Sequence, residues 1–136
     1  MILETLILAN AASINAETGL LDVQGIGWQY FEPAAYPASI MGTICGTVLV
    51  EDGDYGDQHE LTLEVSDDDG HVVRTVGALS FDCTERSERM TVGRLVFHWP
   101  FTTVVRAPTV VRASVTMGGQ QLGSVEFIAR APSGDA

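Results

Sequence analysis

The chain has 136 residues, 46% of them hydrophobic, and carries 18 acidic side chains against 7 basic ones, a formal net charge of −11. A chain of this length fits a single domain with a sizeable core. The excess of carboxylates opposes binding to nucleic-acid phosphates and to anionic membrane surfaces. No apolar run approaches the roughly 20 residues of a membrane-spanning helix. Lysine is absent from the sequence, which excludes lysine nucleophiles and Schiff bases.

The N-terminal run, residues 2–12, is apolar on both faces and predicts the first strand. It has no basic residue ahead of it and contains Glu4, which is unlike a secretory signal. We therefore expect a cytoplasmic protein. A strand that is apolar on both sides also suggests cover by a second copy of the chain, and a symmetric dimer is the commonest oligomer.

Two further strands are predicted before residue 51. Residues 20–31 form one of them, with Gly25 and Gly27 before Trp28 as signs of a bulge or a close backbone approach. After a break at Pro33 to Pro37, residues 39–50 form a long strand. Its apolar residues lie on both faces, with Ile40, Ile44, Val48 and Val50 on one and Met41, Cys45 and Leu49 on the other. Such a strand is central or covered by another layer.

The two cysteines, Cys45 and Cys83, each lie in a strand-like run. A cytosolic chain favours reduced, buried thiols that act as small hydrophobic side chains. The sequence leaves open a disulfide between them.

The middle of the chain predicts a β-hairpin after a polar loop at residues 51–58. Leu61, Leu63 and Val65 alternate with polar residues, and the return strand carries Val73, Leu79 and Phe81. A three-residue turn, Asp68-Asp69-Gly70, would place Val65 opposite Val73, with Gly70 in the left-handed conformation.

The last third of the chain predicts one strand and a second hairpin. After a charged connection at residues 84–91, Leu95, Phe97 and Trp99 alternate with Arg94, Val96 and His98, and Pro100 and Pro108 bracket another connection. The final hairpin pairs residues 109–117 with 120–129 around Gly118-Gly119, a dipeptide suited to a turn with positive φ. Residues 132–136 read as a flexible tail.

These signals together predict one all-β domain over residues 1–131. About eight strands with short connections favour largely antiparallel pairing, because parallel strands need long crossovers. We expect an antiparallel β-sandwich of immunoglobulin-like or C2-like two-layer architecture.

The order of the segments also resembles a bacterial family of unknown function. Leu8-Ala9-Asn10-Ala11-Ala12 followed by residues 19–28 (GLLDVQGIGW) is similar to that family's opening, in which L-A-D-A-A precedes G-K-L-Y-V-L-G-G-G-W. Residues 61–70 are similar to its L-x-L-x-D-x-D-G hairpin, and residues 115–127 to its final hairpin. Asn10 stands where the pattern is acidic, and Ala107-Pro108-Thr109 replaces Pro-Gly-x-Tyr. The resemblance implies a small β-sandwich with no established activity.

The acidic loops suggest calcium as one functional hypothesis. The candidate ligands are Asp52, Asp54, Asp57, Asp67 and Asp69, with Glu60 nearby. They would bind a cation only if the 51–58 loop and the 67–69 turn converge at one end of the sandwich. The EF-hand pattern itself fails, since Gly56 occupies its fifth position. Asp and Gly are also the residues that turns ordinarily prefer.

No catalytic or cofactor motif stands out. The three histidines, His59, His71 and His98, lack metal-ligand spacing. A nucleophile elbow and a dinucleotide loop are both missing from the sequence. We expect neither a cofactor nor an enzyme, although a small hydrolase with a dispersed site stays open.

Aromatic residues at strand ends are the remaining candidates. Trp28 with Tyr30 and Phe31 forms one group, and Trp99 with Phe97 and Phe101 forms the other, with Trp28, Tyr30 and Trp99 as the candidate binding residues. Such residues either anchor partners or fill the core. The leading hypothesis is a non-enzymatic binding or assembly module that recognises a protein partner or a second copy of itself through loops or an edge strand.

Overall fold

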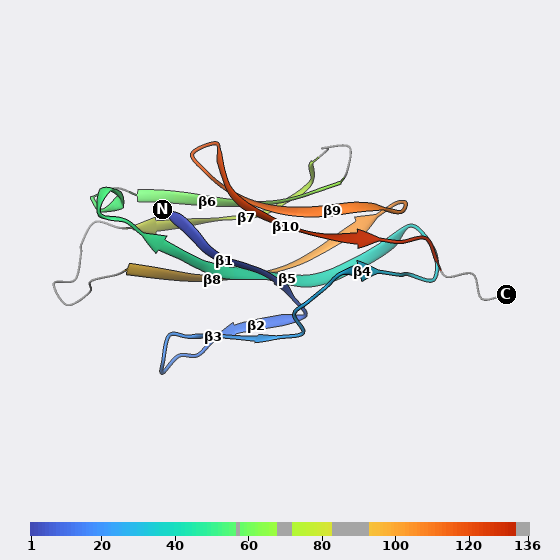
Figure 1. The fold of residues 1–136 in the computed structure, drawn as a ribbon, viewed down its shortest axis with the longest axis horizontal. Coiled ribbons are helices and arrows are strands. Elements are labelled where there is room, and N and C mark those ends of the chain that lie inside the picture. Colours follow the sequence, from blue (N-terminus) through green and yellow to red (C-terminus); the bar gives the residue numbers. More distant parts are fainter. Residues whose placement is uncertain (57, 68–71, 83–92, 133–136) are drawn as a thin grey trace.

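The chain forms an all-β sandwich in a computed structural model that describes residues 1–56, 58–67, 72–82 and 93–132 (Figure 1). A three-stranded sheet of order β1-β5-β8 faces a five-stranded sheet of order β4-β10-β9-β6-β7, and β2 and β3 form a separate hairpin. The predicted sandwich is confirmed. The elements of the described residues are β1 (Ile2–Ala9), β2 (Ala11–Ile14), β3 (Leu21–Gln24), β4 (Tyr30–Phe31), β5 (Ala38–Val50), the 3-10 turn η1 (Asp52–Asp54), β6 (Gln58–Ser66), β7 (Val72–Asp82), β8 (Gly93–Val105), β9 (Thr109–Met117) and β10 (Gln120–Ala129).

The core lies between the two large sheets and follows from period-two alternation along the strands. The predicted alternation in β6 buries Leu61, Leu63 and Val65, which face the other sheet. Burying each such side chain stabilises the fold by about 1.5–3 kcal/mol. The residues that face them from the three-stranded sheet are Ile40, Ile44 and Val48 of β5 and Phe97 and Phe101 of β8. The five-stranded sheet adds further core residues beside β6, namely Val111, Ala113 and Val115 of β9 and Phe127 of β10.

Strand β5 is central in its sheet, as its two apolar faces predicted. β8 pairs with its whole length, whereas β1 pairs only with residues 43–49. On the outer face Cys45 is free and fully buried, and this burial raises the pKa of its thiol. Cys83 lies outside the described residues. In β1, Leu8 and Ala9 are buried within the chain's own fold, whereas Ile2 is half exposed.

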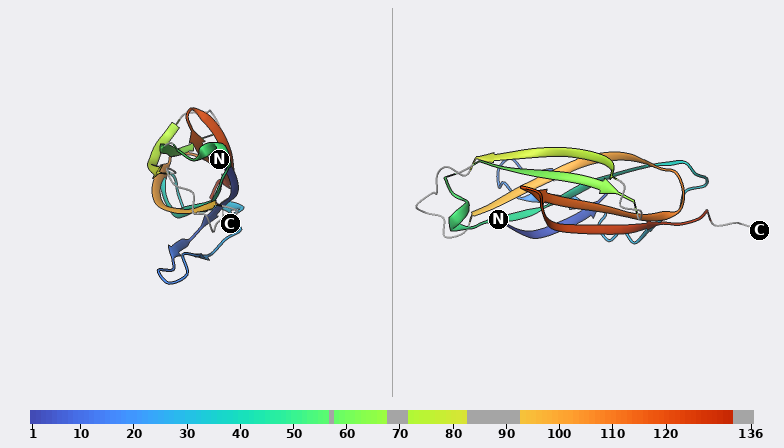
Figure 2. Two further views of the ribbon diagram at one scale, coloured as in Figure 1. Left: turned by 90° about the vertical axis from the view of Figure 1, so that its left-hand side faces the viewer. Right: turned by 90° about the horizontal axis from the view of Figure 1, so that it is seen from above.

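Two predicted strands are interrupted, which is why the described residues contain more strands than the eight expected. The 2–12 run breaks at Asn10 into β1 and β2, and the 20–31 run breaks after Gln24 into β3 and β4. Both breaks occur where the chain leaves the sandwich and returns to it. Between them, β2 and β3 form an arm that extends beyond the three-stranded sheet (Figures 1 and 2).

The prediction that a connection begins at Pro100 is wrong. β8 continues through Pro100 to Val105, and Pro100 pairs with Thr43 of β5. Proline has no N–H to donate, so it is tolerated in strands at sheet edges. β8 is an edge strand of the three-stranded sheet, which explains why the strand is not interrupted.

The two hairpins differ in how well the sequence predicted them. The β9–β10 hairpin has the predicted bounds, and both turn glycines have positive φ, 58° at Gly118 and 80° at Gly119. In the β6–β7 hairpin an irregularity shifts the register, so Val65 pairs with Arg74 and not with Val73. The turn at residues 68–70 lies outside the described residues, as do residues 84–91 and most of the predicted tail. Within the described residues, no helix is long and apolar enough to cross a membrane.

Candidate functional site

The root of the arm is fixed by Asn10. Its backbone N–H lies 3.0 Å from the Gln24 carbonyl oxygen and 3.2 Å from that of Gly25, which holds together the two ends of the arm. Its side-chain Oδ1 accepts a hydrogen bond of 3.0 Å from the indole Nε1 of Trp28. A Cβ at Gly25, whose φ is 72°, would overlap the Asn10 side chain. Glycine is therefore required at position 25 for both conformation and space.

Trp28 connects the two sheets at the point where the arm leaves. Its ring meets Phe127 of β10 edge to face, with centroids 5.6 Å apart and an interplanar angle of 80°. On the opposite sheet, a Cβ at Gly42 of β5 would lie only 2.9 Å from the ring. The indole N–H also donates to the Gly25 carbonyl at 3.1 Å. Trp28 is thus held by contacts in two sheets and by two acceptors.

Both sheets have an unpaired strand edge in this region. β1 ends its pairing with β5 at Thr43, so, among the described residues, residues 38–42 of β5 are paired on the β8 side alone. β4 is the edge of the five-stranded sheet and pairs in parallel with β10. We call this region, made of Trp28, β4 and residues 38–42 of β5, the Trp28 seam.

The edge of β4 exposes the backbone of one residue, Tyr30. The carbonyls of Gln29 and Phe31 accept hydrogen bonds from the N–H groups of Ile128 and Arg130, at 3.0 and 2.9 Å. Successive residues of a strand direct their backbone groups to opposite sides. The N–H and C=O of Tyr30 therefore point away from β10, toward the side where β4 has no ladder partner among the described residues.

Two surface pockets adjoin the seam. One, of about 380 Å³, is lined by residues 27–31. The other, of about 390 Å³, is lined by Asn10, by residues 41–43 of β5 and by residues 100–102 of β8. The Trp28–Asn10 hydrogen bond joins a residue of the first pocket to one of the second. The two pockets therefore lie close to each other.

An arginine braces the exposed ring of Tyr30. The Arg130 guanidinium lies 3.3 Å from the ring centroid, and its Nη1 forms an ion pair of 3.0 Å with Glu32. The hydroxyl of Tyr36 donates to the carbonyl of Arg130, and desolvation raises the pKa of that hydroxyl. Ile128, the register partner of Tyr30, is likewise half exposed. Cation–π and ion-pair contacts thus hold one face of the ring while the rest stays accessible.

The structure brings together two of the three aromatic residues predicted as binding residues. Trp28 and Tyr30 both line the pocket of residues 27–31, whereas Trp99 lies in β8 opposite Ile44 of β5 and lines neither of the two pockets. Sequence reasoning missed Asn10, Met41 and Arg130. A polar residue inside the apolar 2–12 run was the available signal for Asn10. The register that brings Arg130 to Tyr30 had no local signal.

The acidic residues predicted as calcium ligands are not brought together. Asp52 and Asp54 lie in η1, a few residues before β6 begins, whereas Asp67 follows the far end of that strand. A nine-residue strand spans roughly 30 Å, so Asp67 lies far from Asp52 and Asp54 and does not share a site with them. Asp57 and Asp69 lie outside the described residues.

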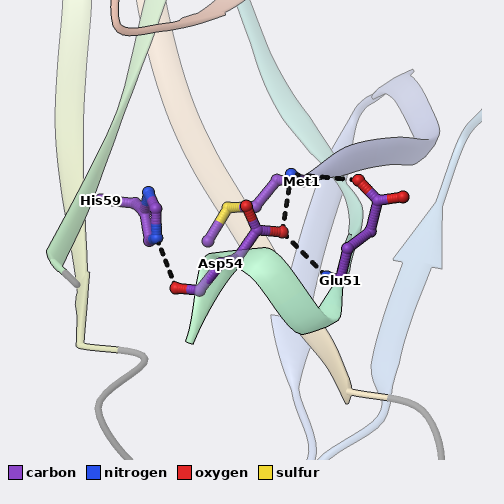
Figure 3. Close-up of polar contacts among 4 residues, drawn as sticks. All are labelled: Met1, Glu51, Asp54 and His59. Carbon is purple, nitrogen blue, oxygen red and sulfur yellow. Dashed lines mark hydrogen bonds and ion pairs between the residues drawn. The ribbon is translucent and has the colours of Figure 1, made fainter. Parts of the chain in front are cut away.

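Asp54 has a structural partner, the ammonium of Met1 (Figure 3). The ammonium nitrogen lies 2.7 Å from Oδ2 of Asp54 and 3.6 Å from Oε2 of Glu51. The same carboxylate accepts the Glu51 N–H at 2.8 Å. Burial raises the pKa of Asp54, but the ammonium, the Glu51 N–H and the nearby His59 outweigh it and lower the pKa below its ordinary value.

The histidines are dispersed. His59 lies 2.7 Å from the Asp54 carbonyl oxygen, His98 pairs with Cys45 across β5 and β8, and His71 lies outside the described residues. Within the parts of the chain that the structure describes, no three His, Cys, Asp or Glu side chains are grouped as metal ligands would be.

Comparison with known proteins gives a family assignment and no closer relative. Residues 4–130 match a protein family described as a family of unknown function, DUF6941. No curated protein and no solved structure matches the chain.

Proposed function

The chain belongs to DUF6941, a family of unknown function, and from the geometry of the Trp28 seam we propose that it is a non-enzymatic protein-binding module. The module takes an extended segment of its partner, which pairs with β4 and places a side chain in the adjoining pockets. The observation that carries this proposal is the position of Tyr30. This residue directs its N–H and C=O to the free edge of β4, and it also lines the pocket formed by residues 27–31.

Strand addition fits such an edge because backbone groups there lack ladder partners. In this mode of recognition, main-chain hydrogen bonds provide affinity and pockets for alternate side chains provide specificity. The edge at β4 is short, so side-chain contacts would contribute much of the binding free energy. Tyr30 and Ile128 lie side by side in register with roughly half of each exposed, and Met41 adjoins the second pocket at 72% exposed.

The composition of the seam supports a binding role. The described residues that line the two pockets carry aromatic, thioether, amide and hydroxyl groups. Aromatic residues and Met are enriched at protein interfaces. The net charge of −11 opposes nucleic acid and anionic lipid as alternative partners.

Tyr30 also offers a sharp test, because its backbone and its side chain can be removed separately. Tyr30→Pro deletes an N–H that points away from β10 and so takes no bond from the ladder. Tyr30→Ala keeps the N–H and deletes the ring. Ile2→Ala is the matched control, since Ile2 is as exposed as Tyr30, 48% against 49%, and lies at the opposite end of β1 from the seam.

The experiment is a random-peptide display selection on the purified chain, followed by fluorescence anisotropy with each variant. We expect the selected peptides to lose about tenfold in affinity with either Tyr30 variant, which corresponds to about 1.4 kcal/mol. Ile2→Ala should leave their affinity unchanged. Peptides that bind Tyr30→Pro and Tyr30→Ala as tightly as the wild type, or a selection that enriches nothing, would contradict the proposal.

A further inference from the structure

The β2–β3 arm is a second feature of this surface that the seam does not explain. The arm leaves the sandwich at Asn10 and returns at Gly25, and its two strands pair from Ala11↔Gln24 to Ile14↔Leu21. It extends away from the two large sheets (Figure 2). A projecting hairpin buries little of its own surface, so its apolar residues stay accessible.

The tip of the arm is a hydrogen-bonded turn. The Asn15 side-chain oxygen accepts bonds from the N–H groups of Glu17 and Thr18, at 2.9 and 3.1 Å. The Asn15 backbone donates to Leu20 at 2.9 Å and accepts from Gly19 at 2.8 Å. Gly19 has a φ of 71°, a conformation for which glycine carries no steric cost. The turn is therefore held in one shape before any partner arrives, which reduces the entropy cost of binding.

The arm presents apolar side chains near its tip and carries two carboxylates that have no partner among the described residues. Leu20 is 65% exposed and Ile14 is 43% exposed. The two residues are close, because Ile14 pairs with Leu21, the residue after Leu20. The only charged residues between Asn10 and Gly25 are Glu17 and Asp22. Neither side chain forms an ion pair or hydrogen bond with the residues that the structure describes. By contrast, three arginines are held by glutamates elsewhere, in the pairs Arg94–Glu4, Arg112–Glu126 and Arg130–Glu32.

We propose that the tip of the β2–β3 arm is a docking element for a basic, apolar segment of a protein partner. The apolar contact uses Leu20 and Ile14, and charge complementarity to Glu17 and Asp22 selects a cationic segment. The inference goes beyond the Trp28 seam and shares with the proposed function only the premise that the chain binds protein. Complementary charge raises the association rate and disfavours partners of the same sign.

The test uses two synthetic probes, a short peptide of alternating Lys and Leu and its counterpart of alternating Glu and Leu. Binding to the whole chain is followed by amide chemical shifts in NMR spectra, with the amides of residues 14–22 reporting the arm. The indole N–H of Trp28 reports the seam. We expect the Lys/Leu peptide to shift the arm amides with a saturable titration and the Glu/Leu peptide to leave them unshifted.

Matched variants distinguish the arm from the general acidity of the chain. Glu17→Lys should weaken binding of the Lys/Leu peptide about fourfold, since an attractive contact becomes a repulsive one and each is worth a factor of about two. Glu60→Lys makes the same charge change at an exposed site on β6 and should alter affinity by less than about twofold. Leu20→Ser should weaken binding, whereas Ile2→Ser should not.

Several outcomes would overturn this inference. They are arm amides that do not shift, shifts of equal size over the whole surface, and equal effects of Glu17→Lys and Glu60→Lys. Shifts of the Trp28 indole with a silent arm would refute the arm and leave the seam standing. If the arm amides shift but no displayed peptide binds at the seam, the arm would stand and the seam would be refuted. Thermal melting of each variant verifies that it is folded.

Discussion

Trp28 is the residue whose removal should disturb the seam most. Its ring meets Phe127 edge to face and lies on Gly42, and its N–H reaches acceptors on Asn10 and Gly25. The aromatic pair contributes about 1 kcal/mol beyond its buried area, and the hydrogen-bonded N–H about 1 kcal/mol. Because the side chain is only partly buried, Trp28→Ala should cost about 3 kcal/mol, at the low end for a Trp-to-Ala change.

Trp28→Phe isolates the hydrogen bonds. It keeps an aromatic ring against Phe127 and deletes the N–H, so it should cost about 1 kcal/mol. Asn10→Ala in the wild-type background should cost no more than that, because the indole keeps its acceptor on Gly25. In the Trp28→Phe background, Asn10→Ala should cost less than it does in the wild type, since no indole N–H remains to be satisfied. The difference between the two costs measures the coupling between Asn10 and Trp28.

Urea unfolding at pH 7 gives these free energies, and Trp28→Ala should lower the melting temperature by roughly 10 °C. A cost below about 1 kcal/mol for Trp28→Ala would refute the view that Trp28 joins the sheets. Equal costs for Trp28→Ala and Trp28→Phe would show that the ring contacts contribute nothing.

Three further predictions concern stability. Gly46→Ala should cost about 3 kcal/mol or more, because its Cβ would overlap the Thr5 carbonyl, whereas Gly53→Ala enters open space and should change stability by less than about 0.5 kcal/mol in urea unfolding. Asp54 has a lowered pKa, so its contribution is present above about pH 4 and is lost as the pH falls through the folded-state pKa; Asp54→Asn should match the wild type only at acid pH. Asn10→Asp keeps the acceptor for the indole and should stay within about 1 kcal/mol of the wild type by thermal melting.

The sequence predicted the strands where one local signal sufficed. The β9–β10 hairpin was predicted with its bounds because two adjacent glycines permit the positive φ that a two-residue turn requires. β5 was predicted from a run with apolar residues on both faces, and β6 from apolar alternation. Pro100 was wrongly predicted to end β8. Proline can continue a strand at the edge of a sheet, and which strand is an edge is a property of the whole sheet.

The candidate site was only partly predictable, because its residues come from distant segments. The two opening segments on which the family resemblance was based contain Asn10, Gly25 and Trp28, and the structure joins these three residues by hydrogen bonds. Asn10 occupies a position where that pattern is acidic, and the indole N–H needs only an acceptor, which either side chain supplies. The approach of Arg130 to Tyr30 depends on the parallel pairing of β4 with β10, and no local pattern encodes it.

Hydrogen exchange at Tyr30 tests the free edge of β4 most directly. In the free chain the Tyr30 amide should exchange rapidly, while the amides of Ile128 and Arg130, which donate to β4, should be protected. A saturating peptide from the display selection should slow exchange at Tyr30 by at least about tenfold. A Tyr30 amide that is already protected in the free chain would contradict a free edge at β4. One that still exchanges rapidly in the saturated complex would contradict strand addition there.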